Sequence, residues 1–276
     1  MRIDAHQHYW RYDPLRDTWI TTDMAVIRRD FFPEHAVQLL AAADIDGVVA
    51  VQASQSEAET DFLLDLAAQH SSVLGVVGWV DLRAPDLRDR LARWRGCAAL
   101  KGFRHVAQGE PDDFLGRPDV VRGVNRIGEH GYSYDILIYP RQLAAAKRLV
   151  EQCPAVRFVL DHCAKPAIAA GEIAGWRDGI TRLARHPNVC CKLSGLVTEA
   201  SWRTWTPADL VPYLDVVAGA FGADRLLFGS DWPVCLLAAE YGAVVDAVAR
   251  WCQRLSRAER TSIFGAAAAT VYRLER

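Results

Sequence analysis

The stretch Val156-Arg157-Phe158-Val159-Leu160 runs directly into the polar pair Asp161-His162. It is apolar at both alternating positions, which is typical of a parallel β-strand covered by other structure on both faces. Eight such runs divide the 276 residues at an average spacing of about 35 residues, which suits a strand followed by a helix. The other seven runs begin near Ile3, Val48, Val73, Ala98, Tyr132, Val189 and Leu226.

Longer stretches rich in Ala, Leu and Arg separate these runs, and their apolar residues recur at the spacing of a helix. No linker rich in Pro, Gly or Ser interrupts the alternation. The sequence therefore predicts an α/β fold with a single domain over residues 1–276, a (β/α)8 barrel of the TIM type. The less regular segment from Arg11 to Pro33 is predicted to be a long loop over the mouth of the barrel. The predicted helical stretches include Glu57 to Ala68, Leu87 to Trp94, Pro140 to Cys153 and Ala239 to Leu255.

Composition and charge exclude several classes of protein. The 32 Lys and Arg residues and 34 Asp and Glu residues leave a formal net charge of −2, and the basic residues are scattered, so nucleic acid is not an expected partner. The chain contains neither an apolar run near the roughly 18 residues of a membrane span nor a signal-peptide core at its start. We therefore expect a cytoplasmic protein that acts on a small molecule and that could form a homo-oligomer. The seven cysteines include no C-x-x-C pair, which favours reduced and mostly buried thiols.

Ionisable residues follow several of the predicted strands, where a (β/α)8 barrel carries its catalytic groups. The first strand ends in His6 and His8, which share one face because side chains alternate with a period of two. His162 follows the sixth strand and Asp231 follows the eighth. These four residues are predicted to converge at one mouth of the barrel as the catalytic site.

Each of the four residues also has a structural interpretation. The two histidines after the first strand could lie on the surface, His162 could be a hydrogen-bonded core residue, and Asp231 could cap the turn that follows it. Ionisable groups at the same level of several strands favour the functional interpretation. The sequence contains no G-x-S-x-G, H-E-x-x-H, G-x-x-x-x-G-K-[ST] or G-x-G-x-x-G motif, which disfavours a serine hydrolase or a nucleotide-binding enzyme.

Polar and aromatic residues at or just past the strand ends are candidates for binding a substrate. In the run from Lys101 to His105 these two residues share a face, and we expect them to point into the barrel and Arg104 to point away. Lys101 and Lys192 could also be charges at the bottom of the barrel or on loops, and Glu199 could be a solvated acid. The candidate substrate-binding residues are Trp10, Gln52, Lys101, Arg104, His105, Tyr134, Lys192, Glu199 and Trp232.

The arrangement of histidines and aspartate resembles the amidohydrolase superfamily. More closely, the chain is similar over its whole length to the lactonase branch of that superfamily, which includes sugar lactonases of the L-fuconolactonase and L-rhamnonolactonase type. The resemblance implies a (β/α)8 hydrolase of carbohydrate catabolism that opens an aldono-lactone to the aldonic acid. The motifs that carry it are Ile3-Asp4-Ala5-His6-Gln7-His8-Tyr9-Trp10, Lys101-Gly102-Phe103-Arg104-His105, Leu160-Asp161-His162-Cys163-Ala164-Lys165-Pro166, Cys191-Lys192-Leu193-Ser194-Gly195-Leu196 and Phe228-Gly229-Ser230-Asp231-Trp232-Pro233.

A metal requirement is the main chemical question that the resemblance raises. Two-metal members of the superfamily carry a histidine after the fifth strand, and the fifth run here has none, so we do not expect two metals. The resemblance implies that Asp231 is the general base for water and that His6, His8 and His162 polarise the lactone carbonyl. The same four residues suit one Zn²⁺ ion. Because a lactone is an activated ester, we expect that such an ion can bind but that no cofactor is strictly required.

Two other functions stay open on the sequence alone. A metal-dependent decarboxylase of the same superfamily would use the same histidines and aspartate, and it would need a tightly bound metal and release CO₂. A non-catalytic binder of sugar acids could also use this scaffold, because a fold by itself does not establish an activity.

Overall fold

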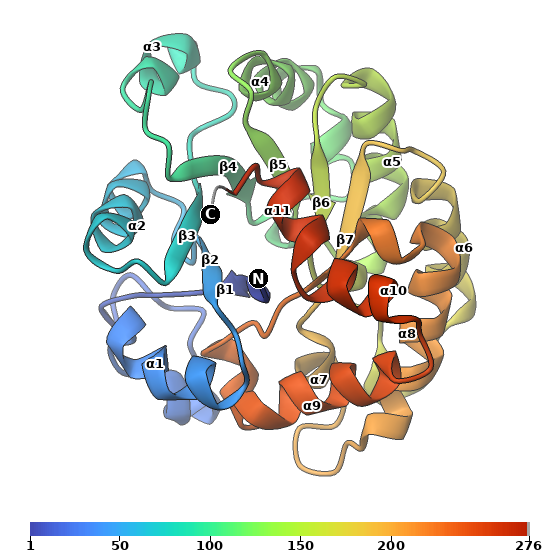
Figure 1. The fold of residues 1–276 in the computed structure, drawn as a ribbon. Helices are drawn as coiled ribbons and strands as arrows, with labels where there is room; N and C mark the ends of the chain where they lie inside the picture. Colours follow the sequence, from blue (N-terminus) through green and yellow to red (C-terminus); the bar gives the residue numbers. More distant parts are fainter. Residues whose placement is uncertain (275–276) are drawn as a thin grey trace.

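Eight parallel strands form one barrel in the computed structural model, which describes residues 1–274 (Figure 1). Each strand pairs with the next one along the chain. The ring closes beyond β8, where Gln7 pairs in parallel with Trp232 and the His8 N–H donates to the Trp232 carbonyl at 2.7 Å. The (β/α)8 prediction is therefore confirmed, and the predicted runs begin within two residues of the strands. The strands are β1 (Ile3–Gln7), β2 (Gly47–Val51), β3 (Val73–Gly78), β4 (Leu100–His105), β5 (Ser133–Ile136), β6 (Phe158–Leu160), β7 (Val189–Leu193) and β8 (Leu226–Phe228).

The helices surround the strands as an outer layer (Figure 1). The four predicted helical stretches correspond to α2, α3, α5 and α9, with ends that differ by at most three residues. None of the helices within residues 1–274 combines the length and the apolar character needed to cross a bilayer. The helices are α1 (Pro33–Ala42), α2 (Glu57–Gln69), α3 (Leu87–Ala92), α4 (Pro118–Glu129), α5 (Leu143–Gln152), α6 (Ala174–Leu183), α7 (Leu196–Glu199), α8 (Pro207–Phe221), α9 (Tyr241–Cys252), α10 (Arg257–Thr261) and α11 (Ala267–Val271).

Local sequence sets where several helices begin. Ser56 precedes α2, and its side chain accepts a hydrogen bond from the Glu59 N–H at 3.2 Å, which satisfies a backbone donor of the first turn. A proline stands at the start of α1, α4 and α8, namely Pro33, Pro118 and Pro207. Proline has no backbone N–H, and at this position an N–H would have no partner within the helix.

The interior of the barrel is apolar at the amino-terminal ends of the strands and polar at the carboxyl-terminal ends. Helix α11 closes the amino-terminal end, and the N-terminus lies near the barrel axis (Figure 1). In the described part of the chain, the barrel is therefore open only at the carboxyl-terminal ends of the strands. The apolar cluster that joins the strands to α11 includes Ile3, Ala5, Val49, Val51, Val77, Val159, Leu227, Ala267, Ala268, Val271 and Tyr272.

The segment from residue 11 to residue 33 lies over the mouth of the barrel, as predicted. It contains a 3₁₀ turn over Thr22–Ile27, and it is fastened at its base where Trp10 and Phe31 exchange backbone hydrogen bonds of 2.9 Å. Arg16 and Asp17 of this segment line the cavity at the carboxyl ends of the strands.

Candidate active site

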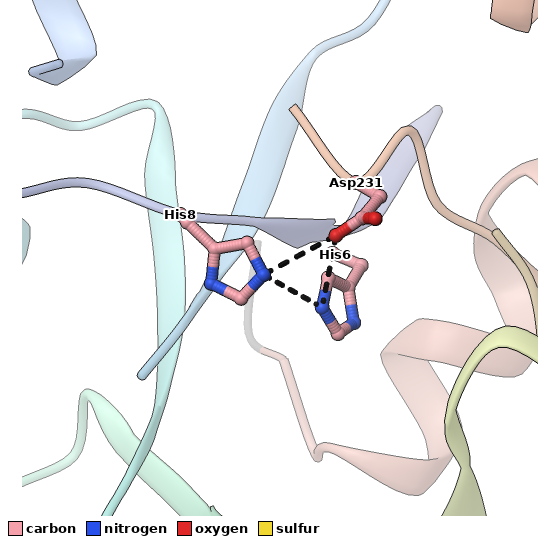
Figure 2. A group of neighbouring side chains, drawn as sticks. All are labelled: His6, His8 and Asp231. Carbon is pink, nitrogen blue, oxygen red and sulfur yellow. Dashed lines mark hydrogen bonds and ion pairs between the residues drawn. The ribbon is translucent and has the colours of Figure 1, made fainter. Parts of the chain in front are cut away.

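His6, His8, His162 and Asp231 lie together at the mouth of the barrel (Figure 2 shows three of them). The Nε2 atoms of His6 and His8 are 3.1 Å apart. The Oδ1 atom of Asp231 lies 3.3 Å from His8 Nε2, 3.7 Å from His6 Nε2 and 3.8 Å from His162 Nε2. All four side chains are buried, so their ring nitrogens and carboxylate oxygen meet in one small polar space.

A buried carboxylate, Asp4, holds the two segments that carry this cluster. Its Oδ1 accepts a hydrogen bond from the Ser230 N–H at 2.8 Å, and its Oδ2 accepts one from Gln7 Nε2 at 2.8 Å. These bonds tie β1 to the loop after β8 at the level of Asp231. The pairing of β1 with β2 shifts register between Asp4 and Gln7, so Ala5 packs in the apolar interior while the next side chain, His6, meets the polar cluster. Asp4 belongs to the motif at the first strand, but the sequence gives no sign that it connects β1 to the loop after β8. That role depends on tertiary contacts, which the spacing of residues does not reveal.

Hydrogen bonds at the far ring nitrogens orient the histidines. His8 Nδ1 lies 2.7 Å from the Val51 carbonyl, which can only accept, so in the neutral ring Nδ1 carries the proton and Nε2 has a free lone pair. His162 Nδ1 lies 2.8 Å from Ser194 Oγ. Burial lowers the pKa of His162 to about 4 and lowers the pKa of His6 well below its ordinary value. Both rings are therefore neutral at neutral pH.

A network of buried charges lies beneath His6. Lys192 Nζ is 2.6 Å from Asp135 Oδ2, 2.9 Å from Asp161 Oδ1 and 3.0 Å from His6 Nδ1. Arg104 Nη1 lies 3.0 Å from the other oxygen of Asp161 and 3.3 Å from His6 Nε2. Burial raises the pKa of Asp135 to about 6, whereas the charges of Lys192 and Arg104 outweigh burial and hold the pKa of Asp161 well below its usual range. Sequence reasoning assigned no role to Asp135 or Asp161.

The expectation for the two faces of β4 was wrong. Arg104 points into the barrel, where its Nε and Nη2 donate to Gln52 Oε1 at 3.0 and 2.8 Å. His105 points outward, stacks on Phe114 and lies 2.9 Å from Glu110 Oε1. Alternation shows which residues share a face but not which face is inside, and the neighbouring strands decide that.

Lys101 also requires correction, because it lies at the closed end of the barrel. Its Nζ donates to the Arg273 carbonyl at 3.1 Å, beside the C-terminal helix α11. Since Lys101 is only the second residue of β4, its side chain starts about 13 Å from the level of His105 at 3.3 Å per residue. This geometry removes Lys101 from the predicted substrate contacts.

The other predicted substrate-binding residues have structural partners. Gln52 supports Arg104, and Lys192 is fully buried in the charge network. Tyr134 packs edge-on against Phe158 outside the barrel interior, and Trp232 packs on Tyr9 and Phe31 behind the cluster. Trp10 lines a neighbouring apolar cavity of about 300 Å³, and Glu199 pairs with Lys165 at 3.3 Å.

The cavity above the cluster has a volume of about 320 Å³, which suits a small molecule. Much of its polar lining comes from loop residues that sequence reasoning did not select, including Arg16 and Asp17 from the long loop after β1. The absence of strand periodicity in loops left no signal for them. Within the described chain the cavity is lined by His8, Arg16, Asp17, Trp19, Ala53, Ser54, Gln55, Arg104, Val106, Gln108, Leu137, His162, Lys165, Asp231 and Val234.

His6, His8 and Asp231 fit a single Zn²⁺ ion, because their ligand atoms all lie within 4.8 Å of one another, and His162 Nε2 lies 3.8 Å from Asp231 Oδ1 beside this group. With ligand bonds of about 2.1 Å, a tetrahedral ion separates its ligand atoms by about 3.4 Å. The contacts of 3.1 to 3.7 Å within this group bracket this separation. In the neutral ring of His8 the Nε2 lone pair is free for such an ion, as metal binding needs.

Gly195 is a positioning residue for His162, and its replacement by alanine is expected to lower kcat about 10- to 100-fold. Gly195 has φ of 64°, and an added Cβ would lie 2.5 Å from His162 Nδ1. The ring would have to move away from Ser194 and from Asp231. Steady-state kinetics would measure the effect.

Gly171→Ala is the matched control for this variant. Gly171 has φ of 68°, but an added Cβ there meets no described atom within 4 Å. It carries the same backbone strain without the contact, so its kcat should equal that of the wild type. Equal kcat values for the two variants would show that Gly195 does not position His162.

The chain is similar to known proteins over nearly its whole length. The family model described as Amidohydrolase matches residues 3–274. An L-fucono-1,5-lactonase from Burkholderia multivorans is 45% identical over 286 residues, which cover 99% of this chain and 96% of the relative. A second L-fucono-1,5-lactonase, from Burkholderia ambifaria, is 37% identical and covers 100% of this chain and 96% of its own.

A solved structure shows the same fold at similar identity. It is an amidohydrolase from Burkholderia multivorans with bound zinc, which superposes with a TM-score of 0.96 at 45% identity and covers all of both chains. The zinc in that relative is consistent with one divalent ion at the group of His6, His8 and Asp231.

Proposed function

The chain belongs to the amidohydrolase family, and from this premise we propose that it is a lactonase, a hydrolase that opens the ring of a sugar lactone to the aldonic acid. The observation that carries the proposal is the Asp231 carboxylate, whose Oδ1 lies within 3.8 Å of three imidazole nitrogens at the base of a cavity of small-molecule size. A hydrolase of an activated ester needs these two elements side by side, a base for water and an electrophilic cluster for the carbonyl.

Asp231 is the proposed general base. Although burial opposes its ionisation, the imidazole groups of His162, His8 and His6 around it lower the pKa of Asp231 below its ordinary value, so the carboxylate is present at neutral pH. It accepts a proton from water as the water oxygen bonds to the lactone carbonyl carbon. It returns that proton to the ring oxygen when the carbon–oxygen bond of the ring breaks, which yields the acid and a hydroxyl.

His6, His162 and Arg104 are proposed to stabilise the carbonyl oxygen as it becomes negative. Arg104 Nη1 lies 3.3 Å from His6 Nε2, so a fixed positive charge borders the cluster. His6, His8 and Asp231 would hold a zinc ion, which when bound supplies Lewis-acid polarisation of the carbonyl. We propose that the hydroxyl groups of the sugar contact polar residues that line the cavity, among them Arg16, Asp17 and Gln108.

A pH-indicator assay over a panel of aldono-1,4- and aldono-1,5-lactones tests the proposed function. Release of one proton per ring opened, with kcat/KM well above the spontaneous rate for at least one sugar lactone, supports it. Lack of turnover across the panel would overturn it. Tight binding of sugar acids in that case would identify a binder, whereas metal-dependent release of CO₂ from an aromatic acid would identify a decarboxylase.

Thorough chelation is expected to leave most of the lactonase activity intact. The ester-like carbonyl needs less activation than an amide, and Arg104, His6 and His162 can stabilise its charge without an ion. Metal content and kinetics measured on the same chelated sample check this expectation. Activity that falls in proportion to zinc content, and returns when zinc is added, would show that the ion is part of the catalyst.

A further inference from the structure

A left-handed turn of four non-glycine residues follows β6. His162, Cys163, Ala164 and Lys165 have φ angles of 52°, 52°, 58° and 49°. Residues with side chains rarely adopt this region, because Cβ comes too close to the following carbonyl oxygen. Such backbone persists only where the surrounding structure holds it, and it concentrates at ligand-binding and catalytic sites. The side chains of this turn are therefore candidates for contact with a ligand.

The turn places Lys165 beside the catalytic cluster. The Lys165 N–H donates to the His162 carbonyl at 2.8 Å, so the two residues are one tight turn apart and their side chains lie on the same side. Both side chains line the cavity above Asp231. The turn is held from behind, where Trp176 Nε1 donates to the Cys163 carbonyl at 2.7 Å.

Lys165 forms an ion pair with an acid from the next strand connection. Its Nζ lies 3.3 Å from Oε1 of Glu199, which ends the short helix α7 after β7. Both side chains are largely buried but keep 19% of their surface exposed, so the pair still reaches solvent. A hydrogen-bond donor and an acceptor thus stand side by side next to His162.

We propose that Lys165 and Glu199 together determine substrate specificity by binding neighbouring hydroxyl groups of the lactone ring, an inference that rests on the proposed lactonase function. An ammonium group only donates hydrogen bonds and a carboxylate only accepts them, whereas a hydroxyl does both. Two adjacent hydroxyls therefore complement this pair. A role at the carbonyl oxygen is disfavoured, because the negative charge of Glu199 would oppose the charge that develops there.

Lys165→Met and Glu199→Gln test the pair, with Lys147→Met and Glu151→Gln as matched controls. The control pair is a salt bridge of 2.5 Å along α5, away from the catalytic cavity. Each variant is assayed on the best aldono-lactone, on a counterpart that lacks one ring hydroxyl, and on δ-valerolactone, which has none. Thermal unfolding of each variant checks that it folds.

Lys165→Met is expected to lower kcat/KM for the hydroxylated lactone about 10- to 100-fold, mainly through KM, as the loss of a charge-assisted hydrogen bond predicts. Its rate on δ-valerolactone should change less than about twofold. For the wild type, a lactone that lacks the hydroxyl bound by the pair should have a kcat/KM lower by a similar factor. For Lys165→Met, loss of the same hydroxyl should lower kcat/KM little further, because the partner of that hydroxyl is already absent. Both control variants should match the wild type.

Equal losses on hydroxylated and plain lactones would overturn the proposal, since Lys165 would then act at the carbonyl or on the fold. Unchanged kinetics on every lactone would overturn it as well. If the wild type does not open δ-valerolactone, the comparison with deoxy counterparts decides alone, and strictly additive losses refute the pair. A wild type that opens no lactone at all would instead show that the proposed function is wrong.

Discussion

Asp231→Asn is expected to lower kcat about 10²- to 10⁴-fold with little change in KM, the range that a positioned general base contributes. The amide is nearly the same size as the carboxylate, so the cavity keeps its shape, but the amide oxygen is a poor proton acceptor. Initial rates over a range of lactone concentrations, measured with the purified variant, separate the two constants. Equal turnover of the variant and the wild type on the best lactone would refute the assignment of Asp231.

The control for this variant is Asp246→Asn, an exposed carboxylate on α9 that should leave both constants unchanged. Because Asp231 also belongs to the cluster that fits zinc, both variants are assayed with and without chelation. A loss that is equally large in the chelated enzyme would assign the effect to the carboxylate itself.

Lys192→Met is expected to destabilise the protein by about 3–5 kcal/mol, the usual cost of removing one partner from a buried ion pair. Lys192 is fully buried and faces two buried carboxylates, Asp135 and Asp161, at 2.6 and 2.9 Å. Without the ammonium group, one negative charge in the barrel has no balancing cation. Urea unfolding at pH 8 would measure the loss, and stability equal to that of the wild type would contradict it.

The pH dependence of the loss provides a second measurement. Burial raises the pKa of Asp135 to about 6 even with Lys192 present, and removing Lys192 raises that pKa further. A raised pKa in the folded state means that stability is kept at low pH and lost as the pH rises through that value. The deficit of Lys192→Met should therefore be smaller at pH 5 than at pH 8.

Two further variants distinguish loss of the charge from loss of packing. Lys192→Met combined with Asp135→Asn should be more stable than Lys192→Met alone, since it removes an unpaired charge. Lys147→Met, in an exposed pair with Glu151, should change stability by less than about 1 kcal/mol. A double variant no more stable than the single one would show that packing of the lysine stem, rather than its charge, stabilises the barrel.

The barrel and the convergence of the four strand-end residues were predictable because they follow from local pattern. Strands that are buried on both faces must carry apolar residues at both alternating positions. Eight such runs, each followed by a helical stretch, match the length of a (β/α)8 barrel. His6, His8, His162 and Asp231 stood out because parallel strands bring their carboxyl ends to one mouth, whatever their distance in sequence.

The residues around the cluster were not predictable in the same way. The run from Lys101 to His105 alternates as a strand should, yet Arg104 faces inward because Gln52 and Asp161 receive its guanidinium there. Lys101 was placed at the wrong end of the barrel because periodicity carries no information on the level at which a strand begins.

The sequence by itself determined the fold, the strand order along the chain and the four residues at the strand ends. The reason is that burial dictates the spacing of apolar residues within each strand and helix, and this spacing can be read from a short segment. The tertiary structure alone decided which face of β4 is inside, how Lys192 balances two buried acids, and that the turn after β6 presents Lys165 next to Glu199. These features depend on contacts between residues far apart in the sequence, such as Lys192 and Asp135, which are 57 positions apart. The free energy of a buried charge depends on its partners rather than on its own place in the chain.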